Sequence, residues 1–251
     1  MIKCQNIKKY FSTGHGFSQK AGVVRAVDDV SLEIEKGEAF GLVGESGSGK
    51  TTLGKIILGI LKPDSGEVAL GTRRVQVIFQ DPHNSLDPKM RVRDIIAEGL
   101  VVRKDPSLRA RRRRAKQSQK NKVEEILDLV QLPKTALNKY PHQFSGGERQ
   151  RIAIARAVIT EPEFIVCDEP VSSLDVTIQL QILNLLKEIR ERLGVTYLFI
   201  SHDLRVIRFM CGRVAVMKEG KIVEQGPADK IYSTPGHPYT RFLLSSILKI
   251  L

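Results

Sequence analysis

The sequence of 251 residues contains no run that approaches the roughly twenty apolar residues needed to cross a bilayer as a helix. Its three cysteines, Cys4, Cys167 and Cys211, lack the spacing of a metal site, which is consistent with a reducing compartment. The first residues lack the apolar core of a secretory signal peptide, and the tail after Phe242 is too short to span a membrane. We therefore expect a cytosolic protein without a membrane span of its own.

An excess of positive charge is concentrated in one segment. The net charge is +12, and residues 103–122 hold ten basic residues and one acidic residue, whereas the remainder is close to balanced. No aromatic side chains interleave with these basic residues, as stacking on single-stranded nucleic acid requires. A solvated basic helix is the leading interpretation, contact with anionic lipid headgroups is the second, and nucleic-acid binding is the third.

A glycine-rich segment between two apolar stretches matches the phosphate-binding pattern G-x-x-x-x-G-K-[ST]. It follows an expected strand at 39–43 and precedes an expected helix at 53–61. Glycines allow backbone amides to turn toward a phosphate, and the start of the helix adds partial positive charge. Lys50 is expected to reach the terminal phosphates, and the Thr51 hydroxyl to bind Mg²⁺. The predicted ATP-binding residues of this loop are Gly44, Glu45, Ser46, Gly47, Ser48, Gly49, Lys50, Thr51 and Thr52.

Two acidic residues follow an apolar run at 164–167, which suits a strand buried on both faces. Asp168 is predicted to hold Mg²⁺ through water, and Glu169 to orient or deprotonate an attacking water. An ordinary strand end with solvated acids is the alternative for this segment taken alone. Its combination with the phosphate loop favours nucleotide hydrolysis.

The expected helix at 152–159 is preceded by Ser145, Gly146, Gly147 and Glu148. Ser145 can cap a helix, and the two glycines leave backbone amides open to an anion. This combination resembles the signature of the ATP-binding cassette (ABC) superfamily. The resemblance implies that the signature residues of one subunit cover ATP held by another, so that two cassettes enclose two ATP molecules with Mg²⁺. It also implies that Asp175 lies at the dimer seam and that His202 contacts the terminal phosphate.

Further stretches resemble importer ATPases of this superfamily. Gln80 follows an expected strand at 75–79 and, by resemblance, contacts Mg²⁺ or water and links the core to a helical region. The stretches 79–88 and 235–240 resemble those of oligopeptide, dipeptide and nickel importers. The short segment 66–80 resembles some nickel and metallophore importers, which favours that branch slightly. Turn and loop chemistry is the alternative interpretation of these stretches.

The superfamily stacks the adenine on an aromatic side chain in the first strand region. Tyr10 and Phe11 are both available for this role, and the spacing from Ile7 favours Phe11. A place in the core is the alternative for either ring.

Strand and helix patterns alternate along most of the chain, which predicts an α/β fold. Residues 26–34, together with two strands expected within 66–79 around Gly71, predict a small antiparallel sheet. With the resemblance, the expected fold is a P-loop (RecA-like) core with a mostly parallel sheet, an N-terminal antiparallel β subdomain and an inserted α-helical subdomain. The expected domain is 1–251, with a core of 1–87 and 141–234, a helical subdomain of 88–140 and a tail of 235–251.

The resemblance implies an ATP-hydrolysing subunit that energises import of peptides, nickel or a metal chelate and lies peripherally at the cytoplasmic face of the membrane. The implied partners are two transmembrane permease subunits, a second ATPase subunit, identical or homologous, and an extracytoplasmic substrate-binding protein. No direct nucleic-acid partner is expected, and no iron-sulfur cluster. Two alternatives are a soluble cassette ATPase that acts on nucleic acid or ribosomes, and an exporter motor.

Overall fold

The computed structural model describes residues 2–13, 22–102 and 112–248. The chain divides into two compact units, the first made of Met1–Arg73, Val166–Glu169 and Thr196–Leu251, and the second of Arg74–Ile165 and Pro170–Val195. The helical subdomain predicted at 88–140 falls inside the second unit, and the domain boundaries predicted from the sequence stay a prediction. Across the described ranges, no helix combines the length and the apolar character that a membrane span requires.

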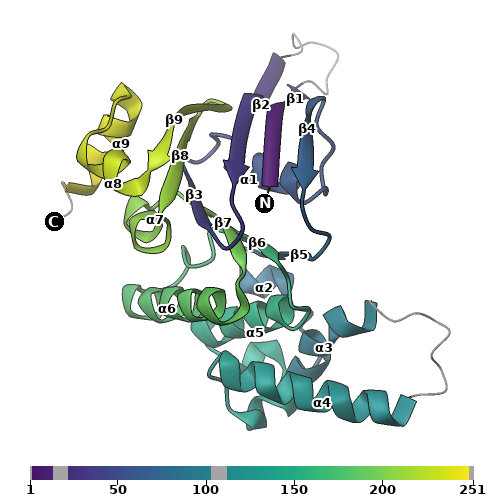
Figure 1. The fold of residues 1–251 in the computed structure, drawn as a ribbon. Coiled ribbons are helices and arrows are strands. Elements are labelled where there is room, and N and C mark those ends of the chain that lie inside the picture. The colour runs from purple at the N-terminus through teal and green to yellow at the C-terminus, as the bar shows by residue number, and fades with distance from the viewer. Residues whose placement is uncertain (1, 14–21, 103–111, 249–251) are drawn as a thin grey trace. The chain divides into compact units, whose positions relative to one another are not determined.

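Three antiparallel strands of the first unit form one sheet, in which β1 lies between β2 and β4 (Figure 1). The strands are β1 (Ile2–Thr13), β2 (Gly22–Ile34) and β4 (Ser65–Leu70). Val30, Leu32 and Ile34 of β2 are buried, while the residues between them are exposed. This period of two is that of a sheet with one face on the core.

The prediction that a second strand within 66–79 joins this antiparallel sheet is wrong. Strand β5 (Val75–Ile78) lies beside the start of β6 (Phe164–Asp168) instead, in the second unit. The backbone amides of Glu163 and Phe164 both donate to the carbonyl of Arg74. Residues 71–74 therefore lead away from the antiparallel sheet and do not form a hairpin turn within it.

The second sheet of the first unit has the strand order β6-β7-β3-β8-β9, with the last residues of β6 at its edge in this unit. The remaining strands are β3 (Ala39–Val43), β7 (Thr196–Ser201), β8 (Arg213–Lys218) and β9 (Lys221–Pro227). β3 pairs in parallel with β7 and β8, and β9 runs antiparallel to β8. Every residue of β3 and β7 is buried, as expected for parallel strands covered on both faces.

Two helices cover opposite faces of strands β3 and β7. A Cβ at Gly54 in α1 (Lys50–Ile57) would lie 2.9 Å from the side chain of Ile200, which pairs with Leu42 and therefore points to the same face. A Cβ at the adjacent Gly41 would lie 2.6 Å from Ile207 in α7 (Leu204–Met210). Because neighbouring residues of a strand face opposite sides, α1 and α7 lie on opposite faces. Helix α1 also packs on β2 and β4 of the antiparallel sheet.

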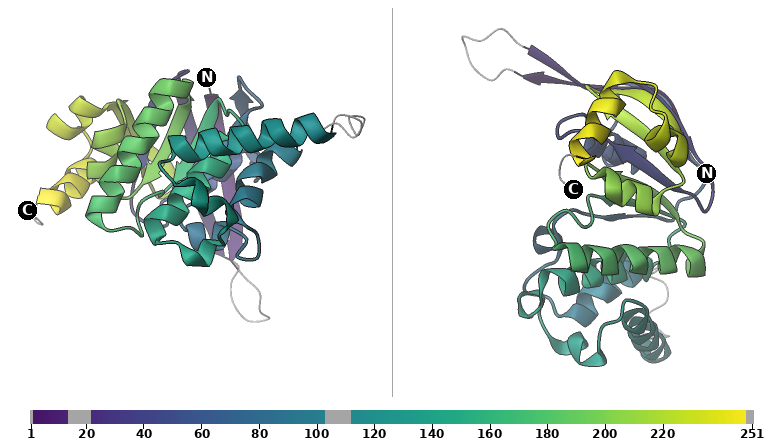
Figure 2. Two further views of the ribbon diagram at one scale, coloured as in Figure 1. Left: turned by 90° about the horizontal axis from the view of Figure 1, so that it is seen from below. Right: turned by 90° about the vertical axis from the view of Figure 1, so that its left-hand side faces the viewer.

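The second unit consists mainly of helices, which surround α5 (Gly146–Val158). Helices α2, α3, α4 and α6 all pack on α5, and Figure 2 shows α6 in green beside it. The other elements are α2 (Pro82–Ser85), α3 (Val92–Val102), α4 (Arg112–Leu129), α6 (Val176–Leu193) and two short turns, η2 (Lys134–Asn138) and η3 (Pro141–Gln143). The helices predicted within 88–140 are confirmed. Of the basic segment, residues 103–111 lie outside the described residues.

The chain closes with two helices of the first unit, α8 (Ala228–Ser233) and α9 (Pro238–Leu248). α8 packs on β8 and β9. The segment 235–240, which the sequence marks as a distinctive stretch, forms the turn into α9 and the first residues of that helix.

Candidate functional site

The glycine-rich loop connects β3 to α1, as its sequence pattern predicts. Gly49 has φ +103, and a Cβ there would lie 1.9 Å from the carbonyl oxygen of Ala26, so this position requires glycine. A Cβ at Gly47, in contrast, meets nothing within 4 Å. The loop is therefore packed against β2 on one side and open on the side where an anion can approach the amides.

Lys50 is buried at the first position of α1, and its side chain folds back over the loop. Its Nζ donates to the carbonyl of Gly44 at 2.7 Å and to that of Glu45 at 2.8 Å. Burial lowers the pKa of Lys50, although the nearby carboxylates of Glu169 and Asp168 oppose this shift. An incoming phosphate would give the Lys50 ammonium a further anionic partner.

The carboxylate of Asp168 and the hydroxyl of Thr51 lie together, with Thr51 Oγ1 donating to Asp168 Oδ1 at 3.1 Å. Burial raises the pKa of Asp168, and the hydrogen bond from Thr51 only partly offsets that shift. Both groups present oxygen atoms, which are the ligands that Mg²⁺ prefers. The pair predicted from two distant motifs is thus brought together within the first unit.

Glu169 and His202 form a second polar pair at the ends of β6 and β7. His202 Nδ1 lies 3.0 Å from Glu169 Oε2, and the exposed fractions of the two side chains are 52% and 13%. Glu169 has φ +49, and its backbone amide donates to the carbonyl of Ile200 at 2.9 Å. A non-glycine residue in this left-handed region is uncommon and is held here by specific contacts.

Tyr10 and Phe11 differ in what their rings contact. The Tyr10 hydroxyl donates to Asp28 at 2.6 Å, and the Arg25 guanidinium lies over its ring. Phe11 is 41% exposed, with Lys9 near its ring. Since the hydroxyl of Tyr10 is already bound within the sheet, Phe11 is the freer of the two rings for stacking on a base.

In the second unit, Ser145 caps α5 as its sequence predicts. The Ser145 hydroxyl accepts from the Glu148 amide at 3.3 Å, while the Glu148 carboxylate accepts from the Ser145 amide at 2.9 Å, which makes a reciprocal capping box. A Cβ at Gly147 would lie 2.5 Å from Ile178 Cγ2, and one at Gly146 would lie 3.3 Å from Leu174. The absence of side chains at both glycines therefore lets the start of α5 approach the start of α6.

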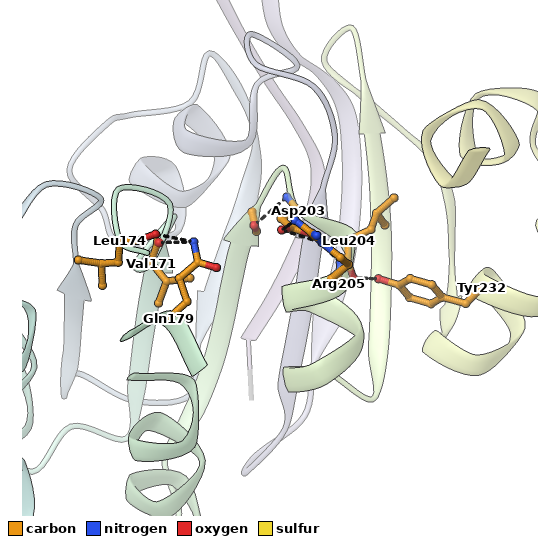
Figure 3. A network of polar contacts seen from close by, with 8 residues as sticks. Val171, Leu174, Gln179, Asp203, Leu204, Arg205 and Tyr232 are labelled. Carbon is orange, nitrogen blue, oxygen red and sulfur yellow. Dashed lines mark hydrogen bonds and ion pairs between the residues drawn. The ribbon is translucent and has the colours of Figure 1, made fainter. Parts of the chain in front are cut away.

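Asp175 caps α6, with its carboxylate accepting from the Ile178 amide at 3.0 Å. Gln179 then ties down the preceding loop, because its side-chain amide donates to the carbonyls of Val171 and Leu174 at 2.9 and 3.0 Å (Figure 3). The capping role of Asp175 could be predicted from an acid before an apolar helical pattern. The role of Gln179 has no such local signal and was missed.

Asp203 caps α7, as an acid before an apolar helix predicts. Its carboxylate accepts from the backbone amide of Arg205 at 2.8 Å and also pairs with the Arg205 guanidinium (Figure 3). The Tyr232 hydroxyl donates to the Leu204 carbonyl at 2.5 Å. These contacts fix the start of α7 directly after His202.

Gln80 lies two residues after β5 in the second unit, and its side chain is exposed. The first unit brings together Lys50, Thr51, Asp168, Glu169 and His202, whereas Gln80, the signature residues and Asp175 belong to the second unit. The roles of these residues stay predictions. Thr52 lies in the first turn of α1, directly after Lys50 and Thr51.

The first unit fits a magnesium nucleotide on three observations. The loop is open at Gly47, the Lys50 ammonium lies over the loop carbonyls, and the Thr51 and Asp168 oxygens converge next to it. A buried cation beside an oxygen-donor pair suits a triphosphate with its metal ion.

Comparison with known proteins agrees with this geometry. Residues 27–172 match the family model described as ABC transporter, and residues 223–250 match the one described as oligopeptide/dipeptide transporter, C-terminal region. The chain is 45% identical to the oligopeptide transport ATP-binding protein OppF of Bacillus subtilis, over 98% of this chain and 82% of that protein. It is 47% identical to OppF of Streptococcus mutans, over 98% of this chain and 81% of that one.

Solved structures share the fold. A dimeric bacterial ABC transporter cassette superimposes with a TM-score of 0.76 at 28% identity, over 91% of this chain and 99% of that one. A dimeric post-hydrolysis cassette bound to ADP and Pi gives a TM-score of 0.75, again at 28% identity and with the same coverage of both chains. The α/β P-loop fold predicted from the sequence is confirmed.

Proposed function

The chain belongs to the ABC transporter family, and we propose that it is the ATP-hydrolysing subunit of a peptide importer. As a member of this family the protein is an ATPase that uses ATP and Mg²⁺. The observation that carries the import of peptides is the match of residues 223–250 to the C-terminal region of oligopeptide/dipeptide transporters. The relatives in Bacillus subtilis and Streptococcus mutans are named for oligopeptide transport. Nickel or a metal chelate stays an untested alternative.

Nucleotide binding is proposed to use the loop of 44–49 and the three residues that follow it. Bound ATP with Mg²⁺ supplies the phosphoanhydride bond to be broken and the charge that polarises it. Lys50 is placed to pair with the terminal phosphates, because its Nζ already lies over the loop carbonyls. Thr51 and Asp168 are the proposed oxygen donors for the cation. Phe11 is the proposed ring for the adenine.

Hydrolysis is proposed to depend on Glu169 and His202. The Glu169 carboxylate is mostly buried and can orient a water or accept its proton. His202 directs Nδ1 toward Glu169 Oε2 at 3.0 Å, which leaves Nε2 for the terminal phosphate. Gln80 is the proposed third contact to the cation or water. The Glu169 amide donates to the Ile200 carbonyl and the Glu169 carboxylate lies 3.0 Å from His202 Nδ1, so both ends of the residue have partners before the reaction.

We propose that two cassettes enclose the nucleotides, with Ser145, Gly146, Gly147 and Glu148 of one facing the phosphate loop of the other. The capped start of α5 supports this role, since the N-terminus of a helix carries partial positive charge that favours anions. Asp175 is proposed to lie at the seam between the subunits, and residues 88–140 are the proposed helical subdomain. Whether the second cassette is identical or homologous stays open, and we favour the homologous form.

The proposed complex contains two permease subunits and an extracytoplasmic substrate-binding protein, with this chain peripheral at the cytoplasmic face of the membrane. Transport can be tested by deleting the gene in its own organism and measuring uptake of a radiolabelled oligopeptide and of ⁶³Ni²⁺ side by side. Loss of peptide uptake that the wild-type chain restores and the Glu169→Gln chain does not restore is the expected result.

Loss of ⁶³Ni²⁺ uptake with unchanged peptide uptake would overturn the peptide assignment and favour the nickel alternative. Unchanged uptake of both, with an ATPase activity stimulated by nucleic acid, would favour a soluble cassette ATPase instead.

A further inference from the structure

The stretch 235–240, which leads into α9, is anchored to β9 by the carboxylate of Glu224. Glu224 accepts hydrogen bonds from the backbone amides of Gly236 at 2.7 Å and His237 at 3.1 Å. Burial alone would raise the pKa of Glu224, but the hydrogen bonds to its carboxylate outweigh that effect and lower the pKa. The turn before α9 is therefore fixed by a charged acceptor.

The same turn starts α9 in a defined direction. His237 Nδ1 accepts from the Tyr239 amide at 3.1 Å, as an N-cap side chain does. Tyr239 is 7% exposed, and the Lys218 ammonium lies 5.0 Å from the centre of its ring. Both the backbone and the ring of Tyr239 thus have fixed partners, which determines where its hydroxyl lies.

The Tyr239 hydroxyl reaches the phosphate loop. It accepts a hydrogen bond from the backbone amide of Glu45 at 3.1 Å. Burial raises the pKa of Tyr239, so the hydroxyl stays protonated through neutral pH.

The Glu45 amide belongs to the same peptide unit as the Gly44 carbonyl, which accepts from Lys50 Nζ at 2.7 Å. The planar unit is held at its amide by Tyr239 and at its carbonyl by Lys50. A Cβ at Gly44 would also lie 2.1 Å from the Met217 carbonyl, so the loop backbone is pressed against β8 here. Rotation of this peptide would break both hydrogen bonds together.

We propose that Tyr239 is a positioning residue for ATP binding, whose hydroxyl holds the Gly44–Glu45 peptide in the orientation that keeps Lys50 over the phosphate loop. The inference rests on the proposed nucleotide-binding role of this loop. The proposal gives the C-terminal region a role in nucleotide binding. Tyr239 lies in the part that matches oligopeptide/dipeptide transporters, and it contacts the phosphate loop, which lies in the part that matches ABC transporters in general.

The test compares Tyr239→Phe with Tyr232→Phe in the full-length chain. Phenylalanine at 239 keeps the buried ring beside Lys218 and removes only the hydroxyl. Tyr232 is a matched control, because its hydroxyl is also hydrogen-bonded to the backbone but donates to the Leu204 carbonyl, outside the loop. Affinity for Mg²⁺-ATP is measured by calorimetric titration, and exchange of the Glu45 amide by hydrogen exchange.

We expect Tyr239→Phe to weaken ATP binding about three- to ten-fold, the range of one lost hydrogen bond, and to speed exchange of the Glu45 amide. The KM for ATP should rise while kcat changes by less than about two-fold, since a misplaced loop weakens substrate and transition state alike. Tyr232→Phe should leave both measurements unchanged. As a second variant, Glu224→Ala frees the turn and should weaken ATP binding in the same direction.

Two results would overturn the inference: an ATP affinity of Tyr239→Phe within two-fold of the wild type, or an equal loss in Tyr232→Phe, which would indicate general loosening. If the wild-type chain itself fails to bind Mg²⁺-ATP, the proposed function fails first and the inference with it.

Discussion

Glu169 Oε2 and His202 Nδ1 lie 3.0 Å apart, although the two residues follow different strands of the sheet. β6 and β7 are neighbours in the sheet, and the Glu169 amide donates to the Ile200 carbonyl of β7, which brings the residues that follow the two strands together. The left-handed backbone of Glu169 then turns its carboxylate away from the strand direction of β6. The sheet thus places this pair of side chains before any ligand binds.

Replacing Glu169 with glutamine should separate binding from hydrolysis. The amide keeps the size of the side chain but cannot accept a proton, so we expect ATP turnover to fall by about 10²- to 10⁴-fold with nucleotide still bound. The ATP-bound variant should accumulate as a dimer, alone or with a homologous ATPase subunit. Turnover can be measured by phosphate release, and assembly by light scattering. Retained hydrolysis would mean that another group serves the water.

Replacing Lys50 with alanine should weaken nucleotide binding by the phosphate loop. The loss of a buried ammonium next to the phosphates is expected to weaken ATP binding about ten- to a hundred-fold, which equilibrium titration would detect. Lys62→Ala is the matched control, because Lys62 is an exposed lysine shortly after α1. Equal ATP affinity in the Lys50 variant and the control would contradict the assignment of the loop.

Replacing Asp168 with asparagine should change how the stability of the nucleotide-free protein depends on pH. Burial raises the pKa of Asp168 in the folded protein. Its contribution to stability is therefore present below the ordinary carboxyl pKa and is lost as the pH rises through the folded pKa. We expect Asp168→Asn to unfold at a higher temperature than the wild type at pH 7, and this advantage to shrink toward pH 4.

Asp64→Asn provides a control of opposite sign. The hydrogen bond from Lys9 lowers the pKa of Asp64, so its contribution is present above the ordinary carboxyl pKa and is lost as the pH falls through the folded pKa. This variant should be less stable than the wild type at pH 7. Thermal unfolding between pH 2 and 8 measures both variants, and a destabilised Asp168→Asn protein at pH 7 would refute the burial argument.

A side chain at Gly147 should force α5 and α6 apart. Because an added Cβ meets Ile178 at 2.5 Å, we expect Gly147→Ala to lower the free energy of unfolding by about 1–3 kcal/mol through overpacking. Gly212→Ala is the control, since a Cβ there meets nothing within 4 Å. Chemical denaturation compares the two variants, and equal stability would show that the helices yield without strain.

The residues whose roles depend on nearby sequence could be predicted. The phosphate loop, the Ser145 cap and the apolar strand before Asp168 each have a local pattern, and the structure has them as loop, cap and strand. Helix α1 begins at Lys50, three residues before the expected start, because the apolar pattern that marked it starts only at Leu53. Local patterns thus locate elements better than they locate their ends.

Contacts between distant segments could not be predicted in the same way. Strand β5 pairs beside β6 and not with β4, and the short connection at 71–74 gave no sign of this change of partner. Tyr239 contacts Glu45 across 194 positions of sequence, and the turn residues around it indicated only a loop. Such pairings depend on how complete elements pack, which periodicity does not encode.

The close fit of Gly54 against Ile200 has a consequence for the energetics of nucleotide exchange. Ile200 presses its side chain on the helix that carries Lys50, while its carbonyl accepts from the amide of Glu169. Ile200 thus contacts both the helix that carries Lys50 and the backbone of Glu169, the residue proposed to act in hydrolysis. Because these contacts exist without a bound nucleotide, part of the entropy cost of ordering the two residues is met when the chain folds rather than when the nucleotide binds.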